Sequence, residues 1–206
     1  MEPTETPDVL APSPADASVR PARTADLRAI GAIHARAWST TYRDLVPPEA
    51  LPHVNAGELT EAWRPWLEQA ERGGPLRHLL VACTGPTVIG FAAFGPAAEP
   101  GAPASGSFPA ELTALYVDGV HQRHGHGSRL LAAGVDLLRE DGATQLVCWV
   151  PAGDGPRIAF LRSAGLAPDG AARLLLPDEE ADEQSGGGVR EVRLWAELGD
   201  PSGDTQ

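Results

Sequence analysis

The sequence of residues 115–131 is LYVDGVHQRHGHGSRLL, and this stretch decides how the chain is expected to fold. An apolar run that ends at Val117 is typical of a strand, and the periodic apolar positions after Gly127 are typical of an amphipathic helix. The first backbone N–H groups of a helix have no partner within it, and the helix dipole adds partial positive charge there. The stretch therefore predicts an anion site, typically for phosphate, at a strand-to-helix turn.

Two familiar phosphate motifs are excluded at this turn. A Walker A loop needs a lysine, and all 16 basic residues of the chain are arginine. The dinucleotide fingerprint GxGxxG would need a glycine at position 130, where the chain has leucine. The pattern that remains is Gln122-x-x-Gly125-x-Gly127. Because glycine has no Cβ, a pyrophosphate can approach the backbone closely at these two positions.

This pattern resembles the acyl-CoA loop of the GNAT superfamily, written Q/R-x-x-G-x-G/A. The similarity extends along the chain, since residues 19–22 resemble the first strand of that superfamily and residues 111–117 its fourth strand. Residues 154–166 resemble its downstream helix, usually N-x-x-A-I-x-F-Y-E-K-x-G-F, and Ala37, Trp38, Tyr42 and Pro47 are similar to the substrate-side helices of one bacterial subgroup. The matches run in the right order over residues 19–198, so the chain resembles a bacterial GNAT N-acetyltransferase.

The order of expected elements agrees with this resemblance. Hydrophobic periodicity and turn residues predict strands at 19–22, 77–84, 87–94, 111–117, 146–150, 171–176 and 189–198. They predict helices from Thr24 to before Pro47, and at 57–72, 127–140 and 156–164, with Thr24 as a cap of the first. This order implies an α/β (α+β) fold with a mixed, mostly antiparallel central sheet of six to seven strands, flanked by about four helices. Residues 1–18 and 199–206 are expected to be disordered tails around a 19–198 domain.

The resemblance also implies the site. Acetyl-CoA is the expected co-substrate, and the acceptor amine attacks its thioester directly. The backbone of three strand residues is expected to hold the acetyl-pantetheine arm and to donate to the oxyanion: Leu115, Tyr116 and Val117. The pyrophosphate is expected on the turn: Gln122, Arg123, His124, Gly125, His126, Gly127 and Ser128. Asp154 and Phe160 are expected to contact the cofactor, and Trp38 and Tyr42 the acceptor.

The catalytic groups are less well defined. Glu111 stands in an otherwise apolar strand and is the candidate general base, acting through water, although a strand-end glutamate facing solvent fits the sequence equally. The tyrosine that usually serves as the acid is Leu161 here, and the usual asparagine is Asp154. Tyr116 or water could supply the proton, although a tyrosine in such a strand is more often a sheet aromatic.

The composition limits the classes of partner that the chain is expected to bind. The formal net charge of -12 argues against nucleic acid and favours an amine-bearing substrate. The sequence H-x-x-H-x-H at 121–126 has no cysteine nearby to complete a metal site, so no metal is expected. Cys83 and Cys148 lie in apolar runs, as reduced core cysteines of a cytoplasmic protein do. No apolar run approaches the roughly 18 residues of a membrane span, and no export signal is evident. Pairing of the last strands between two copies of the chain would make a homodimer.

Three functions fit these observations. The first is an N-acetyltransferase that acts on a primary amine of a small molecule or peptide. The second is a non-catalytic acyl-CoA-binding or regulatory module, an alternative that the leucine at 161 leaves open. The third is an unrelated phosphate-binding fold with a similar loop.

Overall fold

The structure of the chain is a computed structural model that describes residues 17–41, 55–97, 108–175 and 189–199. Within these residues it contains one seven-stranded sheet in the order β1-β2-β3-β4-β5-β7-β6. The strands are β1 (Ala17–Pro21), β2 (His78–Thr84), β3 (Thr87–Pro96), β4 (Pro109–Val117), β5 (Gln145–Pro151), β6 (Ala167–Leu175) and β7 (Val189–Glu197). All neighbours pair antiparallel except β4 and β5. The predicted mixed, mostly antiparallel sheet is confirmed.

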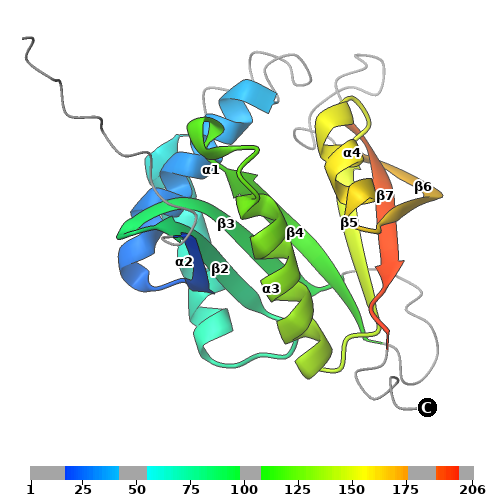
Figure 1. Cartoon of the computed structure of the whole chain (residues 1–206), viewed down its shortest axis with the longest axis horizontal. Coiled ribbons are helices and arrows are strands. Elements are labelled where there is room, and N and C mark those ends of the chain that lie inside the picture. Colours follow the sequence, from blue (N-terminus) through cyan, green and yellow to red (C-terminus); the bar gives the residue numbers. More distant parts are fainter. Residues whose placement is uncertain (1–16, 42–54, 98–107, 176–188, 200–206) are drawn as a thin grey trace, which may run out of the picture.

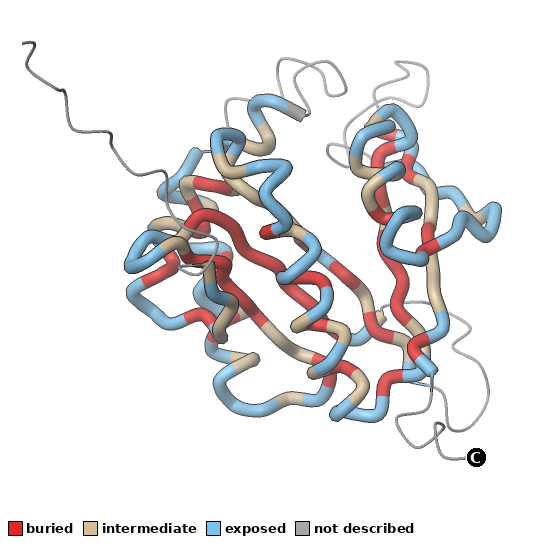
Figure 2. The backbone as a smooth tube through the Cα atoms, viewed as in Figure 1, coloured by how far each residue is buried: buried red, intermediate tan, exposed pale blue. Residues whose placement is uncertain are grey.

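Four α-helices flank this sheet (Figure 1). They are α1 (Leu27–Thr41), α2 (Ala56–Glu71), α3 (His126–Glu140) and α4 (Gly155–Ser163), with short 3-10 turns at η2 (Thr24–Asp26) and η4 (Gly119–His121). Successive residues of a strand point to opposite faces, so the sheet supports two cores. One core joins β2 and β3 to α1 and α2, and the other joins alternate residues of the same strands to α3. Figure 2 shows the buried residues following the central strands while the outer sides of the helices remain exposed.

The strands β4 and β5 pair over three positions only, Pro109 to Glu111 with Gln145 to Val147. Beyond these positions β4 continues beside β3 as far as Val117, and β5 continues beside β7 as far as Pro151. Ala93 pairs with Ala114 while Phe94 pairs with Leu112, so a bulge at Thr113 interrupts β4 where the two strands separate. Figure 1 shows β4 and β5 together at one end and apart at the other, where α3 and α4 begin.

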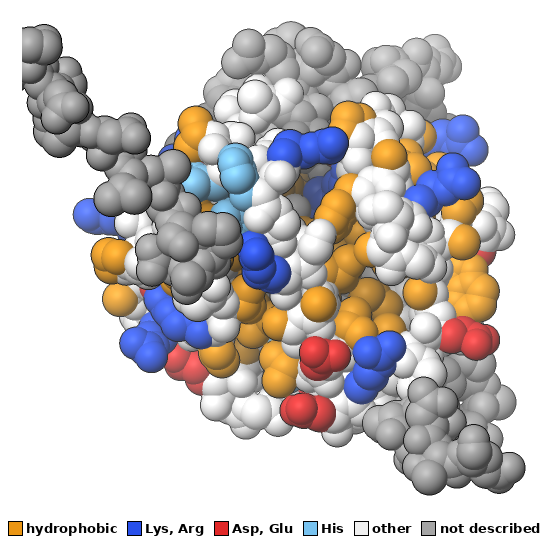
Figure 3. All heavy atoms as spheres, in the orientation of Figure 1, with side chains coloured by type: hydrophobic (Ala, Val, Ile, Leu, Met, Phe, Trp, Pro, Cys, Tyr) orange, Lys and Arg blue, Asp and Glu red, His pale blue; other side chains and the backbone are white. Residues whose placement is uncertain are grey.

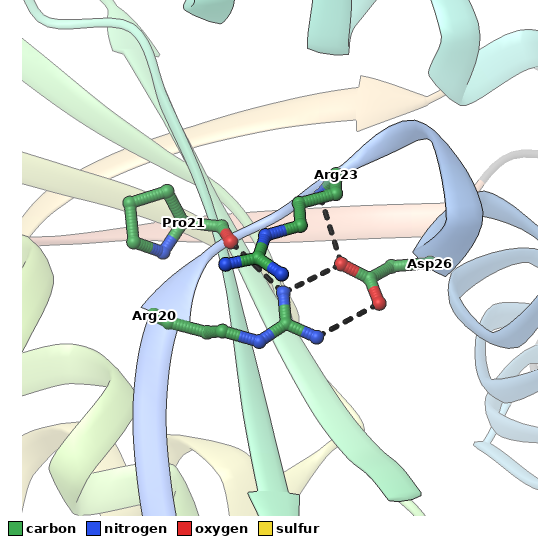
Figure 4. A network of polar contacts seen from close by, with 4 residues as sticks. All are labelled: Arg20, Pro21, Arg23 and Asp26. Atoms are coloured by element: carbon green, nitrogen blue, oxygen red, sulfur yellow. Dashed lines mark hydrogen bonds and ion pairs between the residues drawn. The ribbon is translucent and has the colours of Figure 1, made fainter. Parts of the chain in front are cut away.

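The start of the first helix differs from the prediction. Thr24 lies inside the 3-10 turn and does not cap α1. Instead the Asp26 carboxylate accepts the Arg23 backbone N–H at 2.8 Å and two N–H groups of Arg20 at 2.7 and 2.9 Å (Figure 4). The hydrogen bonds from Arg20 hold the pKa of Asp26 below its ordinary value. The carboxylate therefore ties the end of β1 to the start of α1, through the capping-box bond to Arg23 and through Arg20, six residues away.

Several other boundaries also shift. β1 begins at Ala17, two residues before the prediction, and β4 begins at Pro109. β6 begins at Ala167, four residues earlier than expected. The helix predicted over 127–140 is α3 almost residue for residue, and Gly142 follows it with φ +83°. Most of both predicted tails, and the stretch that includes Pro47, lie outside the described residues.

Gly134 tests the packing of α3 on the sheet. A Cβ at Gly134 would lie 2.1 Å from Cζ of the fully buried Phe94. Overpacking of this kind costs roughly 1–3 kcal/mol, which exceeds the gain of about 1 kcal/mol in helix propensity from alanine. We expect Gly134→Ala to lower the free energy of unfolding by about 1–2 kcal/mol in urea denaturation followed by circular dichroism.

Gly155→Ala is the matched control, because a Cβ at Gly155 meets nothing within 4 Å. It should leave the free energy of unfolding nearly unchanged. A Gly134→Ala protein as stable as the wild type would contradict the packing described for α3.

Candidate functional site

The separation of β4 from β5 leaves one edge of β4 open. Leu115, Tyr116 and Val117 pair with β3 and, among the described strands, have no ladder partner on their other side. All three are half-buried. Backbone groups at such an edge need a partner, because an unpaired buried N–H or C=O is costly. These residues could therefore hold an extended ligand, as expected for the acetyl-pantetheine arm.

The turn from β4 into α3 presents a row of backbone donors. In the described part of the chain, none of the six consecutive N–H groups from residue 123 to residue 128 donates a hydrogen bond. Arg123 and Gly125 have positive φ angles of 66° and 79°, and this alternation turns successive N–H groups toward one side. Gly125 is the N-cap residue of α3, so the helix dipole acts at the same place. The turn has the form of an anion site.

Side chains hold this turn in place from both ends. The Gln122 amide donates to the Val117 carbonyl at 3.0 Å, and His124 Nδ1 lies 2.8 Å from the Gln122 carbonyl. Arg129 donates to the His124 carbonyl at 3.1 Å. Gln122 therefore braces the turn against β4, which is a structural role for the first residue of the sequence pattern.

The helix α4 meets the start of α3 at the open end of the sheet. A Cβ at Gly127 would lie 3.5 Å from Cζ of Phe160, in ordinary van der Waals contact, so α4 packs beside the start of α3. Asp154 caps α4, and its Oδ1 accepts the Arg157 backbone N–H at 3.1 Å. In the space-filling view, apolar side chains gather between the regions of α3 and α4, and histidine side chains gather near the start of α3 (Figure 3). His126, the first residue of α3, is buried, and burial lowers its pKa.

Glu111 stands where β4 and β5 separate. It is the last residue of β4 that pairs with β5, and it is half-buried. Its neighbours Ala110 and Leu112 belong to the core under α3, so alternation turns Glu111 to the opposite face. Tyr116 packs against the core under α1 and α2, on that same opposite face. The structure thus brings the two predicted catalytic residues to one side of the sheet.

Residues from three elements surround Tyr116. The His34 ring of α1 lies 4.9 Å from its ring centroid, the Phe91 ring 5.6 Å away, and the Arg157 guanidinium carbon of α4 5.1 Å away. The Trp63 indole N–H donates to His34 Nδ1 at 3.0 Å. Burial and the nearby Arg157 charge lower the pKa of His34 to about 4, so the ring is neutral at pH 7 and carries its proton on Nε2.

Comparison with known proteins points to the family that the sequence pattern resembles. Residues 36–166 match the family profile described as the acetyltransferase (GNAT) family. The chain belongs to the GNAT acetyltransferase family. It is 29% identical over 188 residues to the uncharacterized N-acetyltransferase YuaI of Bacillus subtilis, an alignment that covers 88% of this chain and 94% of the relative.

Solved structures share this fold. A ribosomal-protein-alanine N-acetyltransferase from Brucella melitensis is similar with a TM-score of 0.64 at 26% identity, over 87% of this chain and 99% of that one. The yncA acetyltransferase of Salmonella typhimurium with acetyl-CoA gives 0.63 at 19% identity, over 91% and 96%. The paia N-acetyltransferase of Thermoplasma acidophilum with coenzyme A gives 0.67 at 15%, over 88% and 98%. The family excludes an unrelated phosphate-binding fold, and the protein is an acyltransferase by family.

Three further positions remain: the two residues expected to contact the acceptor and the position of the usual acid. Trp38 is half-buried on α1 with its ring 6.2 Å from that of His34, beside the Tyr116 cluster. Tyr42 lies outside the described residues. Leu161 is fully buried in the core. The GNAT helix therefore offers no proton donor at the position where the family pattern has tyrosine.

His34 and Arg157 were not predicted as site residues. His34 lies at helical spacing on the apolar side of the first helix, a position that is typical of core residues. Arg157 stands where the family pattern N-x-x-A has alanine, and that departure was the available signal. Within the described ranges no three His, Cys, Asp or Glu side chains are grouped to hold a metal, and no helix is long and apolar enough to span a membrane.

The lowered pKa of His34 makes a prediction about stability. Its ordinary pKa is 6.5 and its pKa in the folded protein is about 4, so between these values the unfolded chain binds one more proton than the folded one. Stability contributed by neutral His34 is therefore complete above pH 6.5 and is lost as the pH falls toward 4, by up to about 3 kcal/mol. We expect His34→Gln to flatten this part of the curve of unfolding free energy against pH.

The measurement is urea unfolding of both proteins between pH 4.5 and 8.5. Above about pH 7.5 the two curves should run parallel, which is the internal control. Curves that stay parallel down to pH 5 would contradict a neutral, buried His34.

Proposed function

We propose that the protein transfers an acetyl group from acetyl-CoA to a primary amine of a small molecule or peptide by direct attack of the amine on the thioester. One observation carries this proposal. The open edge of β4 ends at Val117, and after the short turn η4 the chain reaches the N–H groups of residues 123–128, none of which donates a hydrogen bond within the described residues. An extended arm that ends in a pyrophosphate fits this succession of backbone donors.

The residues of the turn fit coenzyme A. The pyrophosphate would accept hydrogen bonds from the N–H groups of residues 123–128, with the Ser128 hydroxyl and the Arg123 charge beside them. The pantetheine arm would follow the edge of β4 at Leu115, Tyr116 and Val117, with Asp154 and Phe160 on its other side. Solved structures of the same fold that contain acetyl-CoA or coenzyme A support this placement.

The chemistry needs a base and an oxyanion donor. Glu111 would take a proton from the acceptor amine through a water molecule. The amine nitrogen forms a bond to the thioester carbon, and the carbonyl electron pair moves to oxygen, which accepts a hydrogen bond from a backbone N–H of the β4 edge. When the carbonyl re-forms, the C–S bond breaks and the sulfur leaves with the electron pair. Tyr116 or water then gives the thiolate its proton.

A non-catalytic acyl-CoA-binding module is the second candidate, and the buried Leu161 favours it. A thiol leaving group has a pKa near ~8.5, so it departs fairly well without an acid. General acid catalysis contributes roughly 10²–10⁴-fold, and its absence slows the reaction without abolishing it. Release of thiol from acetyl-CoA in the presence of amines separates the two candidates.

Gly127 tests the cofactor site. We expect saturating coenzyme A or acetyl-CoA to raise the melting temperature of the wild type by several degrees, because a ligand that binds only the folded state stabilises it. In Gly127→Val the new side chain would occupy the path between Phe160 and the row of N–H groups, and the thermal shift should disappear. Differential scanning fluorimetry measures both.

Ala132→Val is the control for added bulk on α3, because Ala132 is exposed and two turns into the helix. It should keep the full shift. A wild-type protein whose melting temperature does not move at saturating coenzyme A would overturn the proposed site.

Glu111 tests catalysis separately from binding. Glu111→Gln keeps the size of the side chain and removes the base. We expect kcat for thiol release to fall by roughly 10²–10⁴-fold while the coenzyme A thermal shift stays within a degree of the wild type. Glu140→Gln, at an exposed position on α3, should keep the wild-type kcat. If Glu111→Gln also keeps it, another group is the base.

A further inference from the structure

We infer that the acceptor carries a carboxylate next to its amine, as a free α-amino acid does, and that the Arg157 guanidinium binds this carboxylate. The inference rests on the proposed function, because it concerns the acceptor of the same reaction. It adds the chemical class of the substrate and the residue that selects it.

The guanidinium of Arg157 lies between the separated strands. Arg157 belongs to the first turn of α4, on the β5 side of the opening, but its guanidinium carbon is 5.1 Å from the ring centroid of Tyr116 on β4. Besides burial, its charge also contributes to the lowered pKa of His34 on α1, whose ring centroid lies 4.9 Å from that of Tyr116. A group that starts on α4 and reaches both β4 and the His34 side of the site stands in the opening itself.

This position lies on the acceptor side of the opening. Tyr116 and His34 belong to the face covered by α1 and α2, whereas the turn for the pyrophosphate begins α3 on the other face. The proposed base Glu111 also points to the face of Tyr116. The amine is expected to reach the thioester from the side where the base stands, and Arg157 faces that side.

Glu111 and Arg157 provide opposite charges on the same side of the opening. Glu111 stands at the narrow end, where β4 and β5 last pair, and Arg157 lies farther along β4, over Tyr116. An α-amino acid carries an ammonium and a carboxylate on one carbon, so it matches such a pair with both of its charges. Arginine suits this task because its planar fork binds a carboxylate through two hydrogen bonds and it is more weakly hydrated than lysine.

Neighbouring groups favour a single anionic partner. His34 is neutral at pH 7 because its pKa is about 4, so it adds an Nε2–H donor and no competing charge. The guanidinium would repel a second ammonium group close to the reacting amine, which disfavours diamines and polyamines. The carboxylate would have to compete with the contacts that Arg157 already makes, so we expect selectivity mainly in kcat/KM for the acceptor.

Matched pairs of acceptors test the inference. Each α-amino acid is compared with the amine that remains when its carboxylate is removed, such as tyrosine with tyramine and histidine with histamine, by thiol release from acetyl-CoA. We expect the wild type to prefer the acid of the best pair at least tenfold in kcat/KM. Arg157→Ala, which restores the residue of the family pattern, should lower kcat/KM for that acid by roughly 10–100-fold, the usual effect of losing a charge-assisted hydrogen bond. The paired amine should change less than about threefold.

Arg162→Ala, at an exposed position on the same helix, is the matched control and should leave both values unchanged. If Arg157 only holds α4 against β4, Arg157→Ala will lower both members of each pair alike and weaken the coenzyme A thermal shift. That result would overturn the inference, as would a wild type that acetylates the amines as well as the acids, although the acetyltransferase would then stand.

Absence of thiol release with every acceptor, despite a coenzyme A thermal shift, would instead be a failure of the proposed function. Calorimetric titration of the coenzyme A complex with N-acetyltyrosine and N-acetyltyramine then decides the inference. Tighter binding of N-acetyltyrosine by the wild type, lost in Arg157→Ala, supports the carboxylate site. Equal binding of the two compounds overturns it.

Discussion

The separation of β4 from β5 is the constraint on which the rest of the site depends. Three paired positions join the two strands, and beyond them, among the strands that the structure describes, each is paired on its outer side alone, β4 with β3 and β5 with β7. A sheet that opens in its middle leaves backbone groups to be satisfied by something other than a neighbouring strand. The bulge at Thr113 lies where the opening begins, and Phe160 beside Gly127 brings the two halves together again at the wide end. A binding site is therefore built into the sheet itself.

Charge inside this opening differs from charge on the whole chain. The net charge of -12 favours an amine-bearing substrate, which is a statement about long-range attraction. Within the opening, Arg157 stands over the Tyr116 ring, and Arg123 lies on the turn beside it. A partly buried charge acts strongly on a ligand a few ångströms away. Exposed charges farther from the ligand act more weakly, because water and salt screen them. Composition thus indicates which molecules approach, whereas the groups in the opening decide which of them fit.

Much of the fold could be predicted because its signals are local. The strand, the glycine turn and the apolar stripe at 115–131 predicted the end of β4 and the bounds of α3 to within a residue. The contact between Trp63 and His34 and the reach of Arg157 to Tyr116 could not be predicted in this way. Each joins elements whose distance apart is set by tertiary packing. His34 shows the limit clearly, since one position on a helix stripe serves both as a core residue and as a wall of the site.

The departures at 157 and 161 are best understood together. The two positions are four residues apart on α4, so they share one side of the helix. Leu161 turns into the core and gives up the donor of the family pattern, while Arg157 reaches the opening with a charge that the usual alanine lacks. A thiol near pKa ~8.5 leaves fairly well without a proton donor, so the acid is the group the reaction can most readily lose. Recognition of the acceptor cannot be lost in the same way, because distinguishing one amine from another requires a group that contacts the acceptor. This side of α4 is therefore better suited to recognising the acceptor than to protonating the leaving group.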